Sequence, residues 1–220
     1  MAFLDEQGIF TYVDEEMTML EGFMGEGPIV RIPNTVKMIC NNAFFNEGGI
    51  EEVYVPASVQ TIKGGAFKGC ANLRTVHLEE GLKKIGYSAF EDCESLTEIK
   101  IPDTCIHVED NAFARCIKLS SIIFSANMRR LEKQTCQGCE KLDTIRFGDK
   151  LGSIEAQSFS GCKALREVNL PKNSELIIDP TAFSNCPSLK KLFFQGSKKE
   201  LQTTSPAFVQ KFANVLKTVY

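Results

Sequence analysis

The cysteines are the residues whose type and spacing could most directly do chemistry. Cys136-Gln-Gly-Cys139 has the Cys-x-x-Cys spacing of thiol–disulfide oxidoreductases, in which a thiolate attacks a disulfide. The surrounding sequence lacks the βαβ pattern that makes this motif diagnostic, and no second pair is present to complete a zinc site. A thiol-redox enzyme acting through Cys136 and Cys139 is therefore only the less favoured alternative.

Other chemically active residues are scattered rather than gathered. His77 and His107 occupy different phases of the repeat described below, and Cys105 near His107 is only a weak indication of a metal site. Adjacent acids such as Glu79 and Glu80 would point to opposite faces of a strand, so they do not form an acid–base pair. No nucleophile–base arrangement or phosphate-binding glycine loop is indicated. We expect a protein that is not an enzyme and has no cofactor or metal.

A 23-residue repeat runs through most of the chain and gives the cysteines a different role. A phenylalanine, preceded by a small residue, marks each copy. The marker column reads Phe44, Phe67, Phe90, Phe113, Cys136, Phe159 and Phe183, with one extra residue before the last copy. Three residues further on is the cysteine column, which reads Cys70, Cys93, Cys116, Cys139, Cys162 and Cys186. Apolar columns lie six, nine and eleven residues after the marker and five residues before it.

Each repeat predicts one short coil of a solenoid. In Leu73-x-x-Val76-x-Leu78 the alternation indicates a short strand with one buried face, and a second extended piece is expected near residues 59–62. The Ala-Phe-x-x-Cys segment predicts a tight turn or a single helical turn. Two residues after the marker stands a residue type that tolerates positive φ, with Arg115 as the exception. A single coil cannot bury its apolar positions, so the coils must stack.

The pattern resembles the BspA-like leucine-rich-repeat family. Residues 89–102 carry the 23-residue form almost whole, as Ala89, Phe90, Cys93, Leu96, Ile99, Ile101 and Pro102. The resemblance covers about residues 26–195 and implies a leucine-rich-repeat right-handed solenoid, β-rich with short helical turns, with stacked short parallel strands. It also implies a surface or secreted protein that binds host molecules or other cells, and it carries over no catalytic residues. Cys136 departs from the pattern, and the repeat around it loses bulk.

Three segments are predicted, because the two end coils need caps. They are an N-terminal cap over residues 1–25, about seven leucine-rich coils over 26–195, and a C-terminal cap over 196–220. Residues 8–12 and 17–20 indicate the two strands of a hairpin. Ser205-Pro206 predicts the start of a helix, whereas Ala207-Phe208 could instead begin a degenerate last repeat. The apolar residues that follow at a helical period are Phe208, Phe212, Val215, Leu216 and Val219.

The cysteine column is expected to hold free thiols. Stacked coils would bring neighbouring cysteines about 5 Å apart, which is within disulfide range. However, column side chains point in parallel, and each cysteine has two equivalent neighbours. We therefore predict buried thiols that pack as small apolar groups.

The outward position of the predicted strand, ten residues after the marker, is the candidate binding site. This column is varied where the core columns are uniform, and it mixes aromatic, basic and apolar side chains, as interfaces do. It reads Arg31, Tyr54, His77, Lys100, Ile123, Arg146, Asn169 and Phe193. The column two residues earlier adds acidic groups beside the basic ones.

Charge and hydropathy limit the kinds of partner that the chain can have. With 220 residues and a net charge of −3, the chain has no basic patch dense enough for nucleic acid, and Arg129-Arg130 and Lys198-Lys199 are interpreted as solvated pairs. No apolar run is long enough to predict membrane insertion. A signal peptide would begin with a basic region and continue with a long apolar stretch, whereas here Asp5 and Glu6 follow the first four residues. The chain as given is expected to be cytoplasmic or a mature fragment, whereas the family resemblance favours the cell surface or secretion.

The residues and the resemblance together favour a protein-interaction or adhesion module that binds a macromolecular ligand on its strand face. The expected partner is a protein, such as a host or neighbouring-cell surface protein; carbohydrate has no specific support. The alternative is a structural spacer within a larger surface protein.

Overall fold

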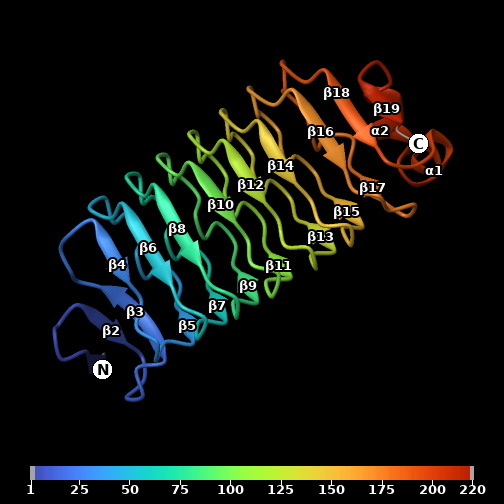
Figure 1. Ribbon diagram of the computed structural model, residues 1–220. Coiled ribbons are helices and arrows are strands. Elements are labelled where there is room, and N and C mark those ends of the chain that lie inside the picture. Colours follow the sequence, from blue (N-terminus) through green and yellow to red (C-terminus); the bar gives the residue numbers. More distant parts are fainter. Residues whose placement is uncertain (1–2, 219–220) are drawn as a thin grey trace.

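The computed structural model describes residues 3–218, which form a solenoid of stacked coils (Figure 1). Each coil contributes two short strands. The first strands are β4 (Ile29–Arg31), β6 (Glu52–Val55), β8 (Thr75–Leu78), β10 (Glu98–Lys100), β12 (Ser121–Ile123), β14 (Thr144–Arg146), β16 (Glu167–Leu170) and β18 (Lys191–Phe194). The second strands are β5 (Met38–Ile39), β7 (Thr61–Ile62), β9 (Lys84–Ile85), β11 (His107–Val108), β13 (Arg130–Leu131), β15 (Ser153–Ile154) and β17 (Ile177–Ile178). The predicted leucine-rich-repeat solenoid is confirmed.

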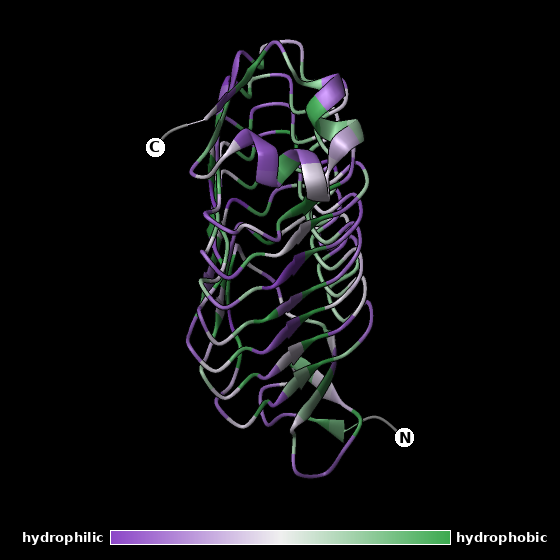
Figure 2. Ribbon diagram, turned by 90° about the vertical axis from the view of Figure 1, so that its right-hand side faces the viewer, coloured by the Kyte–Doolittle hydropathy of each residue, from purple (hydrophilic) through white to green (hydrophobic). Residues whose placement is uncertain are grey.

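Neighbouring strands pair in parallel and in register, so equivalent residues of successive coils lie side by side. Val53 pairs with Val76, and Ile99 with Ile122 and then Ile145. All five are buried, because alternate side chains of a strand face opposite ways and these face the inside of the coil. Coloured by hydropathy, the coils show apolar and polar segments that recur from one coil to the next (Figure 2).

The pairing is interrupted in places. The first strands form the sheets β4-β6-β8, β10-β12-β14 and β16-β18, the last of which is joined by β19 (Leu216–Thr218). The second strands form one sheet that ends at β11 and another that begins at β13. The coils continue to stack across these steps, but the strand ladder opens. Depressions lie at two of these steps, between β8 and β10 and between β11 and β13.

A stack of phenylalanine rings forms the centre of the core. Phe67 and Phe90 lie with ring centroids 5.1 Å apart and planes only 4° from parallel, and Phe90 and Phe113 lie 5.4 Å apart at 5°. The stack begins earlier than the repeat pattern indicates, because Phe23 of the N-terminal cap lies 5.4 Å from Phe44. Stacking at this spacing adds aromatic attraction to the hydrophobic burial.

At Cys136 the ring stack is interrupted, and rings from another column occupy the core beside the gap. Phe124 and Phe147 stack at 5.9 Å, and both meet the ring of Phe159 edge-on, at 6.3 and 5.8 Å. Their column holds aliphatic side chains in most other coils. The bulk that Cys136 lacks is thus supplied eleven residues after the marker.

The turns use left-handed backbone at two columns. Two residues after the marker, φ is positive at every coil, including Arg115 at 58°. The Arg115 guanidinium forms a two-pronged pair with Asp92 of the preceding coil, at 2.7 and 2.8 Å, and also reaches Glu91 at 2.6 Å. These contacts explain a side chain where other coils have glycine, asparagine or aspartate. A second left-handed column, two residues before the marker, was not predicted; it comprises Asn42, Gly65, Ser88, Asn111, Gln134 and Gln157.

All nine cysteines are free thiols, and those of the cysteine column are buried as predicted except Cys186, which is half-buried. The column cysteines do more than pack as apolar groups, because each sulfur lies within hydrogen-bond distance of a backbone carbonyl in the preceding coil. The Cys70 thiol donates to the Phe44 carbonyl at 3.0 Å, and the Cys116 thiol to the Phe90 carbonyl at 3.1 Å. The cysteine column therefore joins each coil to the marker residue of the one before it.

The N-terminal cap is a small antiparallel sheet. β1 (Phe3–Leu4), β2 (Phe10–Tyr12) and β3 (Met19–Phe23) pair in that order, and β3 then pairs in parallel with β5. Both hairpin strands begin two residues later than the sequence suggested. Gly8 and Met17 have φ of 65° and 55°, so they belong to turns rather than to strands.

The C-terminal cap combines the two predicted alternatives. α1 (Lys198–Thr204) begins after Ser197, and α2 (Pro206–Lys211) begins after Ser205. The helix does not continue through Leu216 as its apolar period suggested. The chain returns as β19 (Leu216–Thr218), in which Leu216 pairs with Leu192 of β18 and covers the open edge of the last sheet. Val219 lies outside the described residues.

Candidate ligand-binding surfaces

The eight predicted binding residues lie in one outward row, which we call the first-strand row. Register pairs Arg31 with Tyr54 and Tyr54 with His77, and in the next sheet Lys100 with Ile123 and Ile123 with Arg146. Asn169 pairs with Phe193 in the last sheet. The row thus crosses both openings of the first-strand ladder, and its role in binding stays a prediction.

The N-terminal part of the row is a stack of three side chains. The Arg31 guanidinium carbon lies 3.9 Å from the centroid of the Tyr54 ring. The imidazole of His77, in the next coil, stacks on the same ring with centroids 4.2 Å apart and planes 11° from parallel. Glu52 supports the stack, because one carboxylate oxygen lies 2.7 Å from His77 Nε2 and accepts from the Tyr54 hydroxyl at 2.9 Å. The hydrogen bonds from His77 and Tyr54 lower the pKa of Glu52.

A depression follows at the opening between β8 and β10. Its volume is about 740 Å³, and its lining includes His77, Lys100, Glu98 and Ile123. Lys100 and Arg146 are exposed and Ile123 is half-buried. This part of the row offers an apolar side chain between two cations.

At its C-terminal end the row continues one residue further than predicted. Phe193 pairs with Lys217 of β19, and Lys217 is exposed. Lys191, which forms an ion pair with Glu167 at 2.7 Å, lies 5.7 Å from the Phe193 ring centroid. Lys217 was missed because its segment was interpreted as helix, and no repeat signal survives there.

The Cys136–Cys139 pair lies in the core, and both residues are fully buried. Burial, and then the hydrogen bond with Cys139, raise the pKa of Cys136 well above its usual value. Since the thiolate is the nucleophile in thiol–disulfide exchange, this environment opposes redox chemistry.

The suggested metal site near His107 gains no support. The Cys105 thiol is buried and lies 3.6 Å from the backbone carbonyl of His107, and burial raises the pKa of Cys105 to about 12. Within residues 3–218 there is no group of three or more histidine, cysteine, aspartate or glutamate side chains arranged to hold a metal ion.

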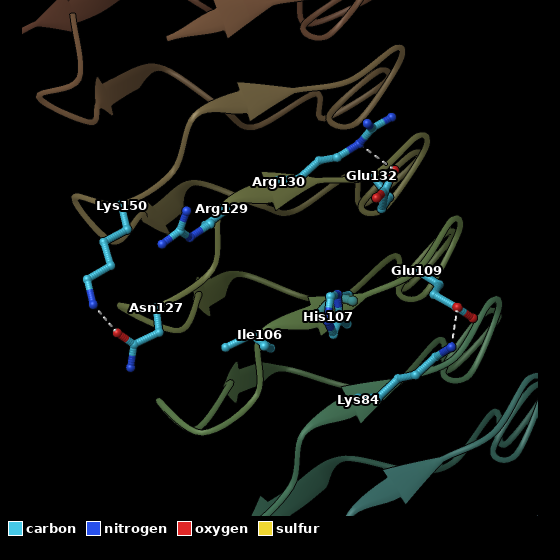
Figure 3. A pocket seen from close by; sticks show the side chains of 10 residues that line it. Lys84, Ile106, His107, Glu109, Asn127, Arg129, Arg130, Glu132 and Lys150 are labelled. Carbon is cyan, nitrogen blue, oxygen red and sulfur yellow. Dashed lines mark hydrogen bonds and ion pairs between the residues drawn. The ribbon is translucent and has the colours of Figure 1, made fainter. Parts of the chain in front are cut away.

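A second depression lies on the other strand face, at the opening between β11 and β13 (Figure 3). We call it the β11–β13 cleft. Its volume is about 600 Å³. Ten residues line it, namely Lys84, Ile106, His107, Val108, Glu109, Asn127, Arg129, Arg130, Glu132 and Lys150. Sequence reasoning missed the cleft and assigned Arg129 and Arg130 to ordinary solvated surface. The only signal was that the columns six and seven residues before the marker vary as much as the first-strand row.

No helix among the described residues has the length and apolar character needed to cross a bilayer.

Two solved structures of high similarity are bacterial repeat proteins. A leucine rich cell surface protein from Faecalibacterium prausnitzii A2-165 matches with a TM-score of 0.78 and 25% identity, over 88% of this chain and 54% of the other. The T. pallidum leucine rich repeat protein matches with a TM-score of 0.76 and 21% identity, over 99% and 94%. The chain thus spans about half the length of the F. prausnitzii protein.

A leucine-rich repeat protein from Eubacterium ventriosum ATCC 27560 has a TM-score of 0.59 and 22% identity, over 94% of this chain and 49% of the other. No curated protein matches the sequence. The BspA type leucine rich repeat region matches in six copies, over residues 28–142 and 83–211. This match spans most of the coils described above, and the chain belongs to the BspA-type leucine-rich repeat family.

Proposed function

We propose that this protein is a non-catalytic interaction module that binds a protein ligand along the first-strand row. The observation that carries the proposal is the outward row of varied side chains that continues along the first strands, beside core columns that are uniform. Solenoids present extended surfaces of this kind, because each coil adds one strand to the same face.

The composition of the row supports a protein ligand. Arginine and aromatic side chains are enriched in protein interfaces, and Tyr54 is held between Arg31 and His77 before any ligand arrives. A side chain that is already ordered loses less conformational entropy on binding. Nucleic acid is disfavoured, since Glu52, Glu98 and Glu167 lie in the neighbouring column and would repel phosphate groups.

A matched pair of variants tests the surface. The first carries Tyr54→Ala, Lys100→Glu, Arg146→Glu and Phe193→Ala. The control makes the same kinds of change away from the row, as Phe45→Ala, Tyr87→Ala, Lys118→Glu and Lys141→Glu, all at exposed positions.

The partner is first identified by photocrosslinking from the position of His77, and its Kd is then measured for both variants. We expect the row variant to bind at least about tenfold more weakly, equivalent to about 1.4 kcal/mol, and the control to bind normally. Equal affinity of both variants and the wild type would sink the proposal. A structural spacer predicts no saturable partner at all.

We further propose that the module is displayed at the cell surface, where it serves adhesion. The support is its likeness to a protein described as a leucine rich cell surface protein. Protease treatment of intact source cells tests this. Loss of the chain from intact cells supports display, whereas survival until lysis would place its partner inside the cell.

A further inference from the structure

We infer that the β11–β13 cleft is a second binding site, which takes an acidic peptide segment with an aliphatic residue beside its carboxylate. This site lies on the second strands and does not depend on the first-strand row. Four observations support it: the open ladder, two cations without a carboxylate partner, an exposed aliphatic side chain, and two glutamates that limit the ligand's charge.

The ladder opens at the coil in which Cys136 replaces the marker phenylalanine. In the neighbouring steps, the Ile106 N–H donates to the Lys83 carbonyl at 3.2 Å, and the Gly152 N–H donates to the Arg129 carbonyl at 2.8 Å. The equivalent bond from the Arg129 N–H to the Ile106 carbonyl is missing from the described part of the chain.

The next bond of the ladder shows the same gap. The Glu109 N–H donates to the Ile85 carbonyl and the Glu155 N–H to the Leu131 carbonyl, each at 3.0 Å, whereas residues 3–218 contain no such bond from the Glu132 N–H to the Val108 carbonyl. Backbone N–H groups released from a ladder are ready donors for an anionic oxygen.

The cations of the cleft divide into paired and unpaired ones. Lys84 lies 2.5 Å from Glu109, and Arg130 lies 3.0 Å from Glu132. Arg129 and Lys150 form no ion pair with any residue of the described range 3–218.

Figure 3 shows where these groups lie. Arg129 and Lys150 share one end of the cleft, the two ion pairs lie toward the other, and His107 lies between. Lys150 Nζ donates to Asn127 Oδ1 at 2.6 Å, which fixes its ammonium group without neutralising it. An arginine and a lysine that line the same end of a cleft suit a carboxylate, to which arginine can donate two hydrogen bonds.

The cleft also has an apolar part. Ile106 is 45% exposed although it is a large aliphatic residue, and it is the exposed aliphatic side chain among the residues that line the cleft. A ligand that carries an aliphatic group beside its carboxylate would bury Ile106 while it neutralises Arg129.

A peptide fits this chemistry better than a polyanion. Glu109 and Glu132 line the same cleft, so a sulfated glycan or a nucleic acid extending along it would meet negative charge. Except for the His107 imidazole, the lining has no ring on which a sugar or base could stack. A short segment with one or two carboxylates avoids both problems.

The test uses a fluorescein-labelled, C-terminally amidated tetrapeptide that alternates aspartate and leucine and so carries two carboxylates, and its counterpart with asparagine in place of aspartate. Binding to the full chain is followed by fluorescence polarisation at low ionic strength. We compare wild type, Arg129→Gln with Lys150→Gln, and the charge-matched control Lys118→Gln with Lys141→Gln. All four substituted residues are exposed, and thermal melting verifies that both variants fold.

We expect the aspartate peptide to bind and the asparagine peptide not to bind. The Arg129/Lys150 variant should lose at least about tenfold in affinity, because two charge-assisted contacts are removed, while the Lys118/Lys141 control and the first-strand-row variant keep the wild-type affinity. Ile106→Ser should weaken binding of the aspartate peptide as well, because its leucine side chains lose an apolar contact.

Three results would overturn the inference. One is equal binding of the two peptides. Another is a loss of affinity for the aspartate peptide that is not specific to the cleft. An equal loss in both charge-matched variants, or a loss in the first-strand-row variant, would place the peptide elsewhere. The third is tighter binding of a heparin hexasaccharide that the Arg129/Lys150 variant abolishes, since that would make the cleft a polyanion site. The first-strand proposal survives any of these outcomes.

Discussion

At the scale of single residues, the core depends on columns of identical side chains. Phe90 is fully buried between two parallel rings, and neither neighbouring coil can move in to fill its place without breaking its own register. The outward residue Lys100, only ten positions later, is exposed and contacts solvent.

Phe90→Ala should therefore lower the free energy of unfolding by about 3–5 kcal/mol, whereas Lys100→Ala should change it by less than about 0.5 kcal/mol. Denaturant melts measure both. Equal small effects would show that the phase assigned to the repeat is wrong.

The cysteines should react in an order set by their surroundings. Burial raises the pKa of Cys70 to about 12 and also raises the pKa values of Cys93 and Cys116 well above the ordinary range, so these thiols should resist labelling until the protein unfolds. Cys40 and Cys186 are the half-buried cysteines. The hydrogen bond from Cys162 lowers the pKa of Cys186, whereas burial and then Glu21 raise the pKa of Cys40.

Near neutral pH, Cys186 should thus be alkylated first and Cys40 second, because a lower pKa gives more thiolate. Mass spectrometry of briefly iodoacetamide-treated protein gives the order. Early modification of Cys136 or Cys139 in the native protein would contradict the buried arrangement and revive the thiol-redox alternative.

At the scale of the coil, a departure in one column is compensated in another. The coil of Cys136 lacks a marker ring, but Phe147 of that coil and Phe124 of the one before it both contact Phe159. A phenylalanine at position 136, as in the other coils, should not raise stability, because the rings of Phe124 and Phe147 already occupy the space beside it.

We expect Cys136→Phe to destabilise the protein by about 1–3 kcal/mol through overpacking. Combined with Phe147→Leu, which makes room, the same substitution should cost less than the sum of the two single changes. A double-mutant cycle in urea measures this coupling. Strict additivity would mean that the rings of the two columns do not share a space.

The openings in the strand ladder are also a property of coils. Two first-strand openings and one second-strand opening divide the strands into separate sheets, while the thiol hydrogen bonds continue through the core. Cys139 donates to the Phe113 carbonyl across the same step at which β11 and β13 are unpaired. The core thus holds the coils together where the surface ladder does not.

At the scale of the whole molecule, each coil contacts only its neighbours, so stability is close to a sum of coil and interface contributions. The C-terminal cap ends this series. Phe208 of α2 is fully buried with its ring centroid 6.3 Å from that of Phe183, and Ser205 Oγ accepts from the Ile178 N–H at 2.7 Å.

Phe208→Ala should consequently open the last coils and leave the first ones intact. Amide hydrogen exchange should show loss of protection in β16–β18 and unchanged protection in β5–β9. Uniform loss along the chain would mean that the molecule unfolds as one cooperative unit.

The sequence by itself determined the repeat, its length, the inward columns, the free thiols and the family. These follow from periodicity, because a residue that recurs at one phase in every coil must meet the same surroundings each time. Even the first-strand row could be predicted, since strand alternation fixes which side chains face outward.

Tertiary structure alone decided what happens where the repeat fails or where two coils meet. Arg115 adopts positive φ because Asp92 and Glu91 of the previous coil hold it, and β19 forms because β18 has an open edge to cover. The β11–β13 cleft likewise gathers Ile106, Arg129 and Lys150 from successive coils through a break in pairing that no single repeat encodes. Contacts between coils depend on distance in space, and periodicity along the chain describes only what every coil has in common.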